Sequence, residues 1–364
     1  MRRPRSSHRS AVSRLRFEPL EARFLLSAAP GIDEPLLLEP NAALTAEAIP
    51  AASELGQTDF LEIADLDLAT ADHWYCGRTA HEGYLTVEAR FQGSPDQVEV
   101  RLYDAGLNEL ATSSASEVGQ RIDCGASAGQ TYYFSVTGGS ADVDLRVANL
   151  VRQDKHSVTV HGTNGDDRFE FTAGESHRVT INGVDYAFAS KTMKRLAFDG
   201  GAGEDTAVLS GSAGTDHAEM HPSRAELKGP GYRVVVDGVA DVTVIDQGGN
   251  GVARLFDDPG AQDTFQAWPH QAILSGNGFC HRVESFRFVH AYGTPGGNDI
   301  ALLHGDPGAA DTFEAWPTMA RLYGAGYYNR VKSFRWVHAY GTPGGDDVAL
   351  LHGAPHAADT FEAW

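Results

Sequence analysis

A motif that recurs every 47 to 49 residues fills the second half of this 364-residue chain. One Asp marks each copy of the motif: Asp167, Asp216, Asp263, Asp311 and Asp359. The nonapeptide Val-His-Ala-Tyr-Gly-Thr-Pro-Gly-Gly also occurs twice, at 289–297 and at 337–345. A fixed period of this size is typical of a stacked array, because one unit cannot bury its apolar face alone. Arrays extend a surface and seldom build one catalytic pocket, so the repeat favours a protein that is not an enzyme.

Each repeat contains short runs in which apolar and polar residues alternate, as in half-buried strands. In the fourth copy these predicted strands are 300–304, 312–316, 320–323 and 334–340. We therefore predict a β-solenoid or β-helix-like array over 151–364, in which each repeat adds a layer. Six aromatic residues recur with the period and are expected to stack in ladders: Phe265, Phe313, Phe361, Trp268, Trp316 and Trp364.

The region 58–150 has the pattern of a separate all-β domain. Its candidate strands are 73–79, 83–91, 97–104, 118–124, 130–137 and 141–148. The motifs Asp72-His-Trp-Tyr75, Gly83-Tyr-Leu-Thr-Val87, Val100-Arg-Leu-Tyr-Asp104 and Ala128-Gly-Gln-Thr-Tyr-Tyr-Phe-Ser-Val136 follow one another in this region. In this order they resemble the bacterial pre-peptidase C-terminal domain. The resemblance implies a jelly-roll-like β-sandwich that accompanies secreted peptidases and other exported proteins without being the catalyst.

Charge is divided unevenly along the chain. Residues 1–30 carry seven Arg and two Glu, which leaves 22 basic and 47 acidic residues in the remainder. The chain after residue 30 is so acidic that it repels phosphate backbones, and we therefore expect no nucleic-acid partner. No run of 18 apolar residues occurs, so no transmembrane helix is predicted.

The basic segment 1–30 ends in Leu20-Glu-Ala-Arg-Phe-Leu-Leu26. This resembles the N-terminal Leu-Glu-Pro-Arg-x-Leu-Leu motif of large planctomycete proteins, with Ala22 in place of Pro, and implies export to the cell surface or medium. Residues 31–57 are rich in Ala, Glu, Leu and Pro, which predicts a linker. The sequence stops within a repeat, at Trp364, and solenoids need a polar cap. We therefore expect a truncated C-terminus, with completion of the array by a partner as the alternative.

A Gly-rich turn that ends in Asp recurs at 162–167, 200–205, 293–299 and 341–347. It resembles the Gly-Gly-x-Gly-x-Asp repeat of RTX-type, haemolysin-like proteins, which implies calcium. Gly exposes backbone carbonyls in a tight turn, and Asp adds the hard oxygen ligands that Ca²⁺ prefers. The candidate ligands are Asp205, Asp299, Asp347, Asp166, Asp167 and Asp199. The alternative is that each Asp only caps its own turn.

Cys76 and Cys124 fall in the same predicted domain and are candidates for a disulfide, with two free thiols as the alternative. The nearest approach to a Gly-x-Ser-x-Gly nucleophile motif is 210–214, which lacks the first Gly and the strand–turn–helix context. We predict no catalytic residues.

The sequence thus predicts an exported, non-catalytic structural or interaction protein of the cell surface, stabilised by calcium, with other surface proteins or extracellular polysaccharide as partners. One alternative is the accessory region of a secreted peptidase or other hydrolase whose catalytic domain lies outside this chain. A second alternative is a polysaccharide-binding adhesin that uses exposed aromatic ladders.

Overall fold

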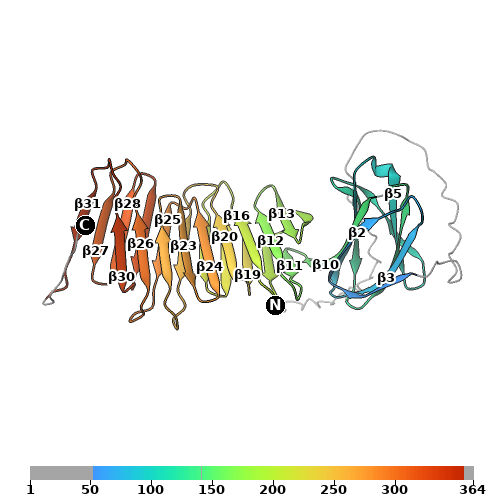
Figure 1. Ribbon diagram of the computed structural model, residues 1–364, viewed down its shortest axis with the longest axis horizontal. Coiled ribbons are helices and arrows are strands. Elements are labelled where there is room, and N and C mark those ends of the chain that lie inside the picture. Colours follow the sequence, from blue (N-terminus) through green and yellow to red (C-terminus); the bar gives the residue numbers. More distant parts are fainter. Residues whose placement is uncertain (1–51, 141, 356–364) are drawn as a thin grey trace, which may run out of the picture. The chain divides into compact units, whose positions relative to one another are not determined.

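The computed structural model describes residues 52–140 and 142–355, and nearly all regular structure in them is β (Figure 1). One 3₁₀ turn, η2 (Pro95–Gln97), is the only helical element in these ranges. The predicted all-β class, a sandwich followed by a β-solenoid, is confirmed. The basic segment 1–30, Phe361 and Trp364 lie outside the described residues. No helix in the described ranges is long and apolar enough to cross a membrane.

Two sheets form the sandwich. The first contains five strands, in the order β1 (Ser53–Thr58), β3 (His73–Thr79), β9 (Thr131–Gly138), β5 (Val98–Asp104) and β6 (Glu109–Thr112). The second contains β2 (Phe60–Leu66), β10 (Val143–Asp154), β4 (Gly83–Phe91), β8 (Gly119–Ala126) and β7 (Ser114–Ser116). Their alternating inward residues, such as Val87 and Phe134, form one buried apolar core. The strand β1 begins inside the range that was predicted as linker, so the sandwich includes part of that range.

Each repeat of the solenoid contributes a three-stranded antiparallel meander followed by two single strands. The meanders are β12–β13–β14 (Arg168–Thr172, Ser176–Ile181, Val184–Ala189), β17–β18–β19 (His217–His221, Arg224–Gly229, Tyr232–Asp237), β22–β23–β24 (Thr264–Ala267, Gln271–Gly276, Phe279–Glu284) and β27–β28–β29 (Thr312–Trp316, Met319–Gly324, Tyr327–Lys332). The single strands are β11 (Ser157–His161), β15 (Arg195–Asp199), β16 (Thr206–Ser210), β20 (Asp241–Ile245), β21 (Val252–Phe256), β25 (Phe288–Tyr292), β26 (Ile300–His304), β30 (Trp336–Tyr340) and β31 (Val348–Leu351).

The meanders alternate between the two sheets of the solenoid. After a meander in one sheet, the chain adds a strand to the opposite sheet and a strand to the first, so the next meander begins in the opposite sheet. Thus β22–β24 belong to one sheet and β27–β29 to the other, although their sequences are nearly the same. The structural period is therefore two sequence repeats, and equivalent residues of successive repeats lie on opposite faces of the core.

The single strands pair in parallel with the meander strands of neighbouring layers. Phe169 lies opposite Ala207, and Phe265 lies opposite Ala301, so a large inward side chain faces a small one at these positions. All four are fully or almost fully buried in one continuous apolar core.

The alternation corrects the predicted aromatic ladders. Trp268 directly follows β22 and Trp316 ends β27, and because these strands lie in opposite sheets the two rings cannot stack on each other. Instead, Trp268 stacks on His304 and His304 on Tyr340, with ring centroids 5.0 and 4.7 Å apart. Trp316 stacks on His352 in the other sheet, at 4.8 Å.

Candidate metal centre

Buried aspartates line the turns between the two sheets of the solenoid. Those with little or no exposure are Asp167, Asp205, Asp216, Asp246, Asp257, Asp263, Asp299 and Asp311. Most directly precede a strand, where the chain enters the next layer. A buried carboxylate is costly unless hydrogen bonds, protons or a cation compensate for it. The partners of these carboxylates therefore decide what each turn can bind.

In the ordinary turn, the Asp at its end holds the backbone at its start. Oδ2 of Asp311 accepts the backbone N–H of Asp306 at 2.6 Å, and Oδ2 of Asp216 accepts that of Ser212 at 2.7 Å. Gly305 begins the first of these turns, and a Cβ there would lie 2.5 Å from Oδ2 of Asp311. Glycine at the first position therefore leaves room for the carboxylate.

The same aspartates also link one layer to the next. A backbone N–H at the end of one turn donates to Oδ1 of the Asp in the following layer, in the pairs Asp167–Asp205 (2.8 Å), Asp263–Asp299 (3.0 Å) and Asp311–Asp347 (2.9 Å). Each carboxylate thus joins chain segments 36 to 38 positions apart. These turns do more than reverse the chain, since they fix the register of adjacent layers.

The turns at 257–263 and 293–299 bring three carboxylates together. Single oxygens of Asp257, Asp263 and Asp299 all lie within 4.8 Å of one another. Their residues are 8%, 0% and 0% exposed. Among the residues that the structure describes, Oδ1 of Asp263 and Oδ2 of Asp299 are buried without a hydrogen-bond partner. Burial, with adjacent negative charge, raises the pKa values of Asp257 and Asp263.

The six predicted calcium ligands do not form a single site. Asp166, Asp199 and Asp347 are exposed, whereas Asp167 and Asp205 are buried together. Asp299 alone joins a cluster of three carboxylates, with two partners that were not among the predicted ligands. The sequence contained a signal for one of them, because Asp257 occupies the position of Gly305 in the next repeat.

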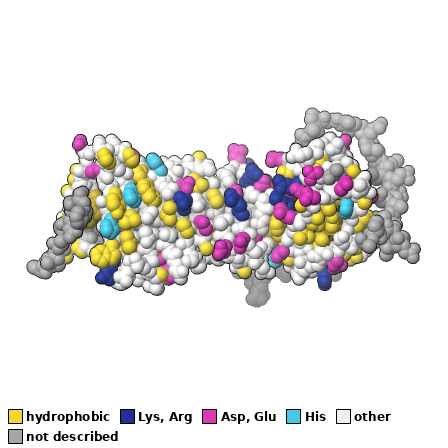
Figure 2. Space-filling model, in the orientation of Figure 1, with side chains coloured by type: hydrophobic (Ala, Val, Ile, Leu, Met, Phe, Trp, Pro, Cys, Tyr) yellow, Lys and Arg dark blue, Asp and Glu magenta, His cyan; other side chains and the backbone are white. Residues whose placement is uncertain are grey.

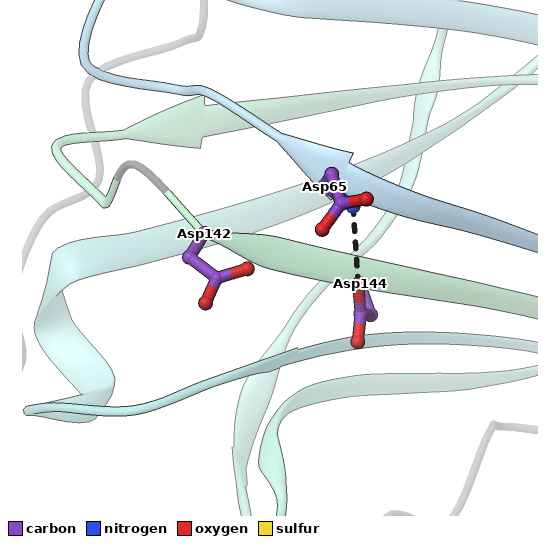
Figure 3. A group of neighbouring side chains, drawn as sticks. All are labelled: Asp65, Asp142 and Asp144. Carbon is purple, nitrogen blue, oxygen red and sulfur yellow. Dashed lines mark hydrogen bonds between the residues drawn. The ribbon is translucent and has the colours of Figure 1, made fainter.

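A second group of three carboxylates lies in the sandwich. Asp65 of β2, Asp144 of β10 and Asp142 just before β10 approach one another, and the Asp65 backbone N–H donates to Oδ1 of Asp144 at 3.1 Å (Figure 3). All three residues are exposed. Exposed carboxylates are well solvated without an ion, so their proximity alone does not indicate one.

The two cysteines that could have formed a disulfide are free thiols. Cys76 lies on β3 and Cys124 on β8, which belong to different sheets of the sandwich. The Cys76 thiol donates to Oε2 of Glu54 at 3.3 Å, and burial raises the pKa values of both thiols. The predicted pairing is therefore not formed in this structure.

The aromatic stacks cover part of their own ring surface, while Tyr340, at the end of one stack, is 46% exposed. The rings of Trp268, His304 and Tyr340 lie face to face, so each covers its neighbour. Hydrophobic side chains and histidines gather on the last described repeats, as Figure 2 shows. A cleft of about 770 Å³ there is lined by inward core residues such as Phe334 and Leu322. Its lining continues the apolar core of the solenoid.

Comparisons with known proteins leave the family open. No family model matches the chain, and none of the curated proteins matches it. The chain is similar over 27% of its length to the pre-peptidase C-terminal domain of a collagenase from Bacillus anthracis, with 15% identity, a TM-score of 0.22 and 92% of that domain covered. It is also similar over 27% of its length to PliG, a periplasmic inhibitor of g-type lysozyme from Aeromonas hydrophila, with 10% identity, a TM-score of 0.19 and 96% covered. Scores this low carry no argument about function.

Proposed function

We propose that this chain is an exported, non-catalytic structural or interaction protein, in which an acidic β-solenoid acts as a spacer joined to a β-sandwich. The observation that carries the proposal is the continuity of one sheet through both parts. β10 pairs with β2 and β4 of the sandwich and, at its end, with β11 of the solenoid. A shared strand transmits load through backbone hydrogen bonds, whereas a flexible linker does not.

Side chains support the same junction. The hydroxyl groups of Thr86 and Tyr186 lie 2.9 Å apart and are buried. The guanidinium group of Arg121 lies over the Tyr186 ring, 4.9 Å from its centroid. Arg146 donates to the backbone carbonyl of Gly183 at 2.9 Å. Such a packed interface suits a protein that holds two surfaces at a fixed separation.

The repeats supply the length of the spacer. The smaller solenoid sheet contains ten strands, and strands about 4.8 Å apart extend such a sheet over roughly 45 Å. Calcium remains part of the proposal, since the turns concentrate carboxylates inside an acidic body. Export to the cell surface or medium, and surface proteins or polysaccharide as partners, rest on the N-terminal motif and the charge.

Fractionation and activity assays on the full-length protein test the proposal. Antibodies against the solenoid should label intact cells, and protease added outside should digest the protein. The purified chain should hydrolyse peptide, ester and glycoside substrates no faster than a heat-denatured sample. Cytoplasmic retention or clear hydrolysis would contradict the proposal. Hydrolysis only by a longer product of the same gene would favour the alternative, an accessory region of a secreted hydrolase.

A further inference from the structure

Two turns of neighbouring repeats differ at only two of seven positions. Residues 257–263 read Asp-Asp-Pro-Gly-Ala-Gln-Asp, and residues 305–311 read Gly-Asp-Pro-Gly-Ala-Ala-Asp. Asp257 therefore stands where the second turn has Gly305. The turns at 211–216, 293–299 and 341–347 also begin with Gly. The substitution adds a carboxylate at a place where the fold ordinarily leaves room for another one.

Asp257 interacts with the turn of the next layer. Its Oδ2 accepts the backbone N–H of Thr294 at 2.6 Å, and its Oδ1 accepts the Thr294 hydroxyl at 3.1 Å. In the turn at 341–347, the corresponding N–H of Thr342 donates to Asp347 of its own turn, at 3.2 Å. Asp257 thus takes the donor that Asp299 would otherwise use. This explains why Oδ2 of Asp299 is buried without a donor among the described residues.

The charge of this cluster is not balanced by the groups around it. The charges of Asp299, Asp257 and Asp258 act on Asp263, and all three are carboxylates. For Asp257 the charged neighbour is again Asp299. Within residues 52–140 and 142–355, the ion pairs join Arg or His to other carboxylates. Three carboxylates with so little exposure require a compensating cation or bound protons.

We infer that Asp257, Asp263 and Asp299 bind one hard divalent cation, Ca²⁺, between adjacent layers of the solenoid. Ca²⁺ binds oxygen ligands at about 2.3–2.6 Å, so two oxygens on opposite sides of the ion lie roughly 4.6–5.2 Å apart. The oxygens of the three carboxylates lie within 4.8 Å of one another, close enough to contact one ion together. Ca²⁺ accepts flexible coordination by carboxylate and backbone oxygens, whereas Mg²⁺ demands a near-ideal octahedron and usually keeps several waters, so a buried carboxylate cluster suits Ca²⁺ better. An ion here would join the turns at 257–263 and 293–299.

This inference rests on the calcium part of the proposed function and names the site, including two ligands outside the sequence-predicted set. It does not depend on export or on the absence of catalysis, which cell fractionation and substrate assays test separately. A failure of the ion site would therefore leave the spacer proposal standing, and the reverse also holds.

The test measures Ca²⁺ binding and thermal unfolding of the full chain after removal of metal by a chelator. Asp257→Gly gives this turn the first residue of its neighbour and should fold normally. Asp299→Asn keeps an oxygen for the Asp263 N–H and serves as the second variant. Asp144→Asn is the matched control, because it disrupts the exposed carboxylate group of the sandwich.

Millimolar Ca²⁺ should raise the unfolding temperature of the wild type and of Asp144→Asn, by mass action on the native state. Both variants of the buried cluster should bind Ca²⁺ at least about tenfold more weakly, because they remove charge from the ligand set. A calcium response that is equal in wild type and Asp257→Gly would overturn the inference and place the ion elsewhere. No response in the wild type would also overturn it, and would show that bound protons neutralise the buried carboxylates.

Discussion

The Tyr232 hydroxyl donates a hydrogen bond to Oδ1 of Asp216 at 2.8 Å, and both residues are buried. In the following repeat Phe279 occupies the position of Tyr232 and Asp263 that of Asp216. Oδ1 of Asp263 therefore lacks a hydroxyl donor and has no other partner in the described part of the chain. A hydroxyl in the sequence is not sufficient by itself, because in the next repeat neither the Tyr327 hydroxyl nor Oδ1 of Asp311 has a partner among the described residues.

Replacement of Tyr232 by Phe should reproduce that deficit at Asp216. The variant leaves a buried carboxylate oxygen without its donor, and we expect the free energy of unfolding to fall by about 1–3 kcal/mol. Denaturant unfolding followed by circular dichroism measures the change. In the reciprocal variant Phe279→Tyr, a hydroxyl placed toward Asp263 should raise the unfolding midpoint. Equal midpoints for Tyr232→Phe and the wild type would show that the hydrogen bond contributes nothing.

Glycine beside the same carboxylate is the second test of this turn. A Cβ on Gly229 would lie 2.1 Å from Oδ1 of Asp216, so Gly229→Ala must displace the carboxylate from Tyr232. We expect a loss of more than about 2 kcal/mol, since the change breaks a buried polar pair. Gly139→Ala is the control, because a Cβ there meets no atom within 4 Å. It should change the midpoint by no more than about 0.5 kcal/mol.

Strand patterns were predictable where side chains alternate clearly between apolar and polar. The expected strands 73–79 and 83–91 coincide with β3 and β4. The Tyr-rich segment of β29 was not predicted as a strand. Tyr328, Asn329 and Arg330 interrupt the alternation of apolar and polar residues that a half-buried strand normally shows. In the structure Tyr327, Asn329 and Val331 point inward, as a strand requires. The polar sequence of β1 also lacks a clear alternation and therefore predicts a linker. The segment becomes a strand because it pairs with β3, which lies elsewhere in the sequence.

The alternation of the meanders could not be read from the repeat. Residues 263–268 and 311–316 are almost identical, yet β22 and β27 lie in opposite sheets. Nearly identical residues adopt the same local strand conformation. Which of the two sheets the strand joins depends instead on how many times the preceding chain has crossed the core. The candidate site was missed for a related reason. The Gly-rich motif drew attention to Asp299, whereas the informative residue was the one that departs from the repeat, Asp257.

His281 predicts a loss of stability in mild acid. Its side chain is fully buried on β24, and neither ring nitrogen has a hydrogen-bond partner within the described ranges. Burial lowers the pKa of His281 to about 4. Because the unfolded chain binds the proton near pH 6.5 and the folded chain does not, stability should fall as the pH decreases from about 6.5 to about 4. The total loss should approach roughly 3 kcal/mol.

Replacement of His281 by Leu provides the measurement for that prediction. The variant removes both orphaned nitrogens and should be at least as stable as the wild type at pH 7. Its unfolding midpoint should depend less on pH between 4 and 6.5 than that of the wild type. If the two pH profiles run parallel, another group is responsible.

The junction at Tyr186 predicts coupled unfolding of the sandwich and the solenoid. Tyr186→Ala removes a buried ring that contacts Thr86 and Arg121. A large-to-small change of this kind costs about 3–5 kcal/mol. In calorimetry we expect one main transition for the wild type and two for the variant, since the interface no longer joins the parts. Tyr186→Phe keeps the ring, and should retain a single transition at a slightly lower temperature.

The buried carboxylates predict the opposite pH dependence from His281 in the metal-free protein. The pKa values of Asp257 and Asp263 are raised by burial and by adjacent carboxylates. The folded state then holds protons that the unfolded state has released, so this contribution is complete below the unfolded pKa near 4 and decreases as the pH rises through the folded values. Chelated wild type should therefore lose stability from this source as the pH is raised from about 4, and Asp257→Gly should lose less.

Added Ca²⁺ should restore the stability of the wild type at pH 7, because the cation replaces the protons as the compensating charge. Unfolding midpoints of both proteins across this pH range, with chelator and with Ca²⁺, separate the two forms of compensation. A chelated wild type whose midpoint depends on pH no more than that of Asp257→Gly would contradict this account of the cluster.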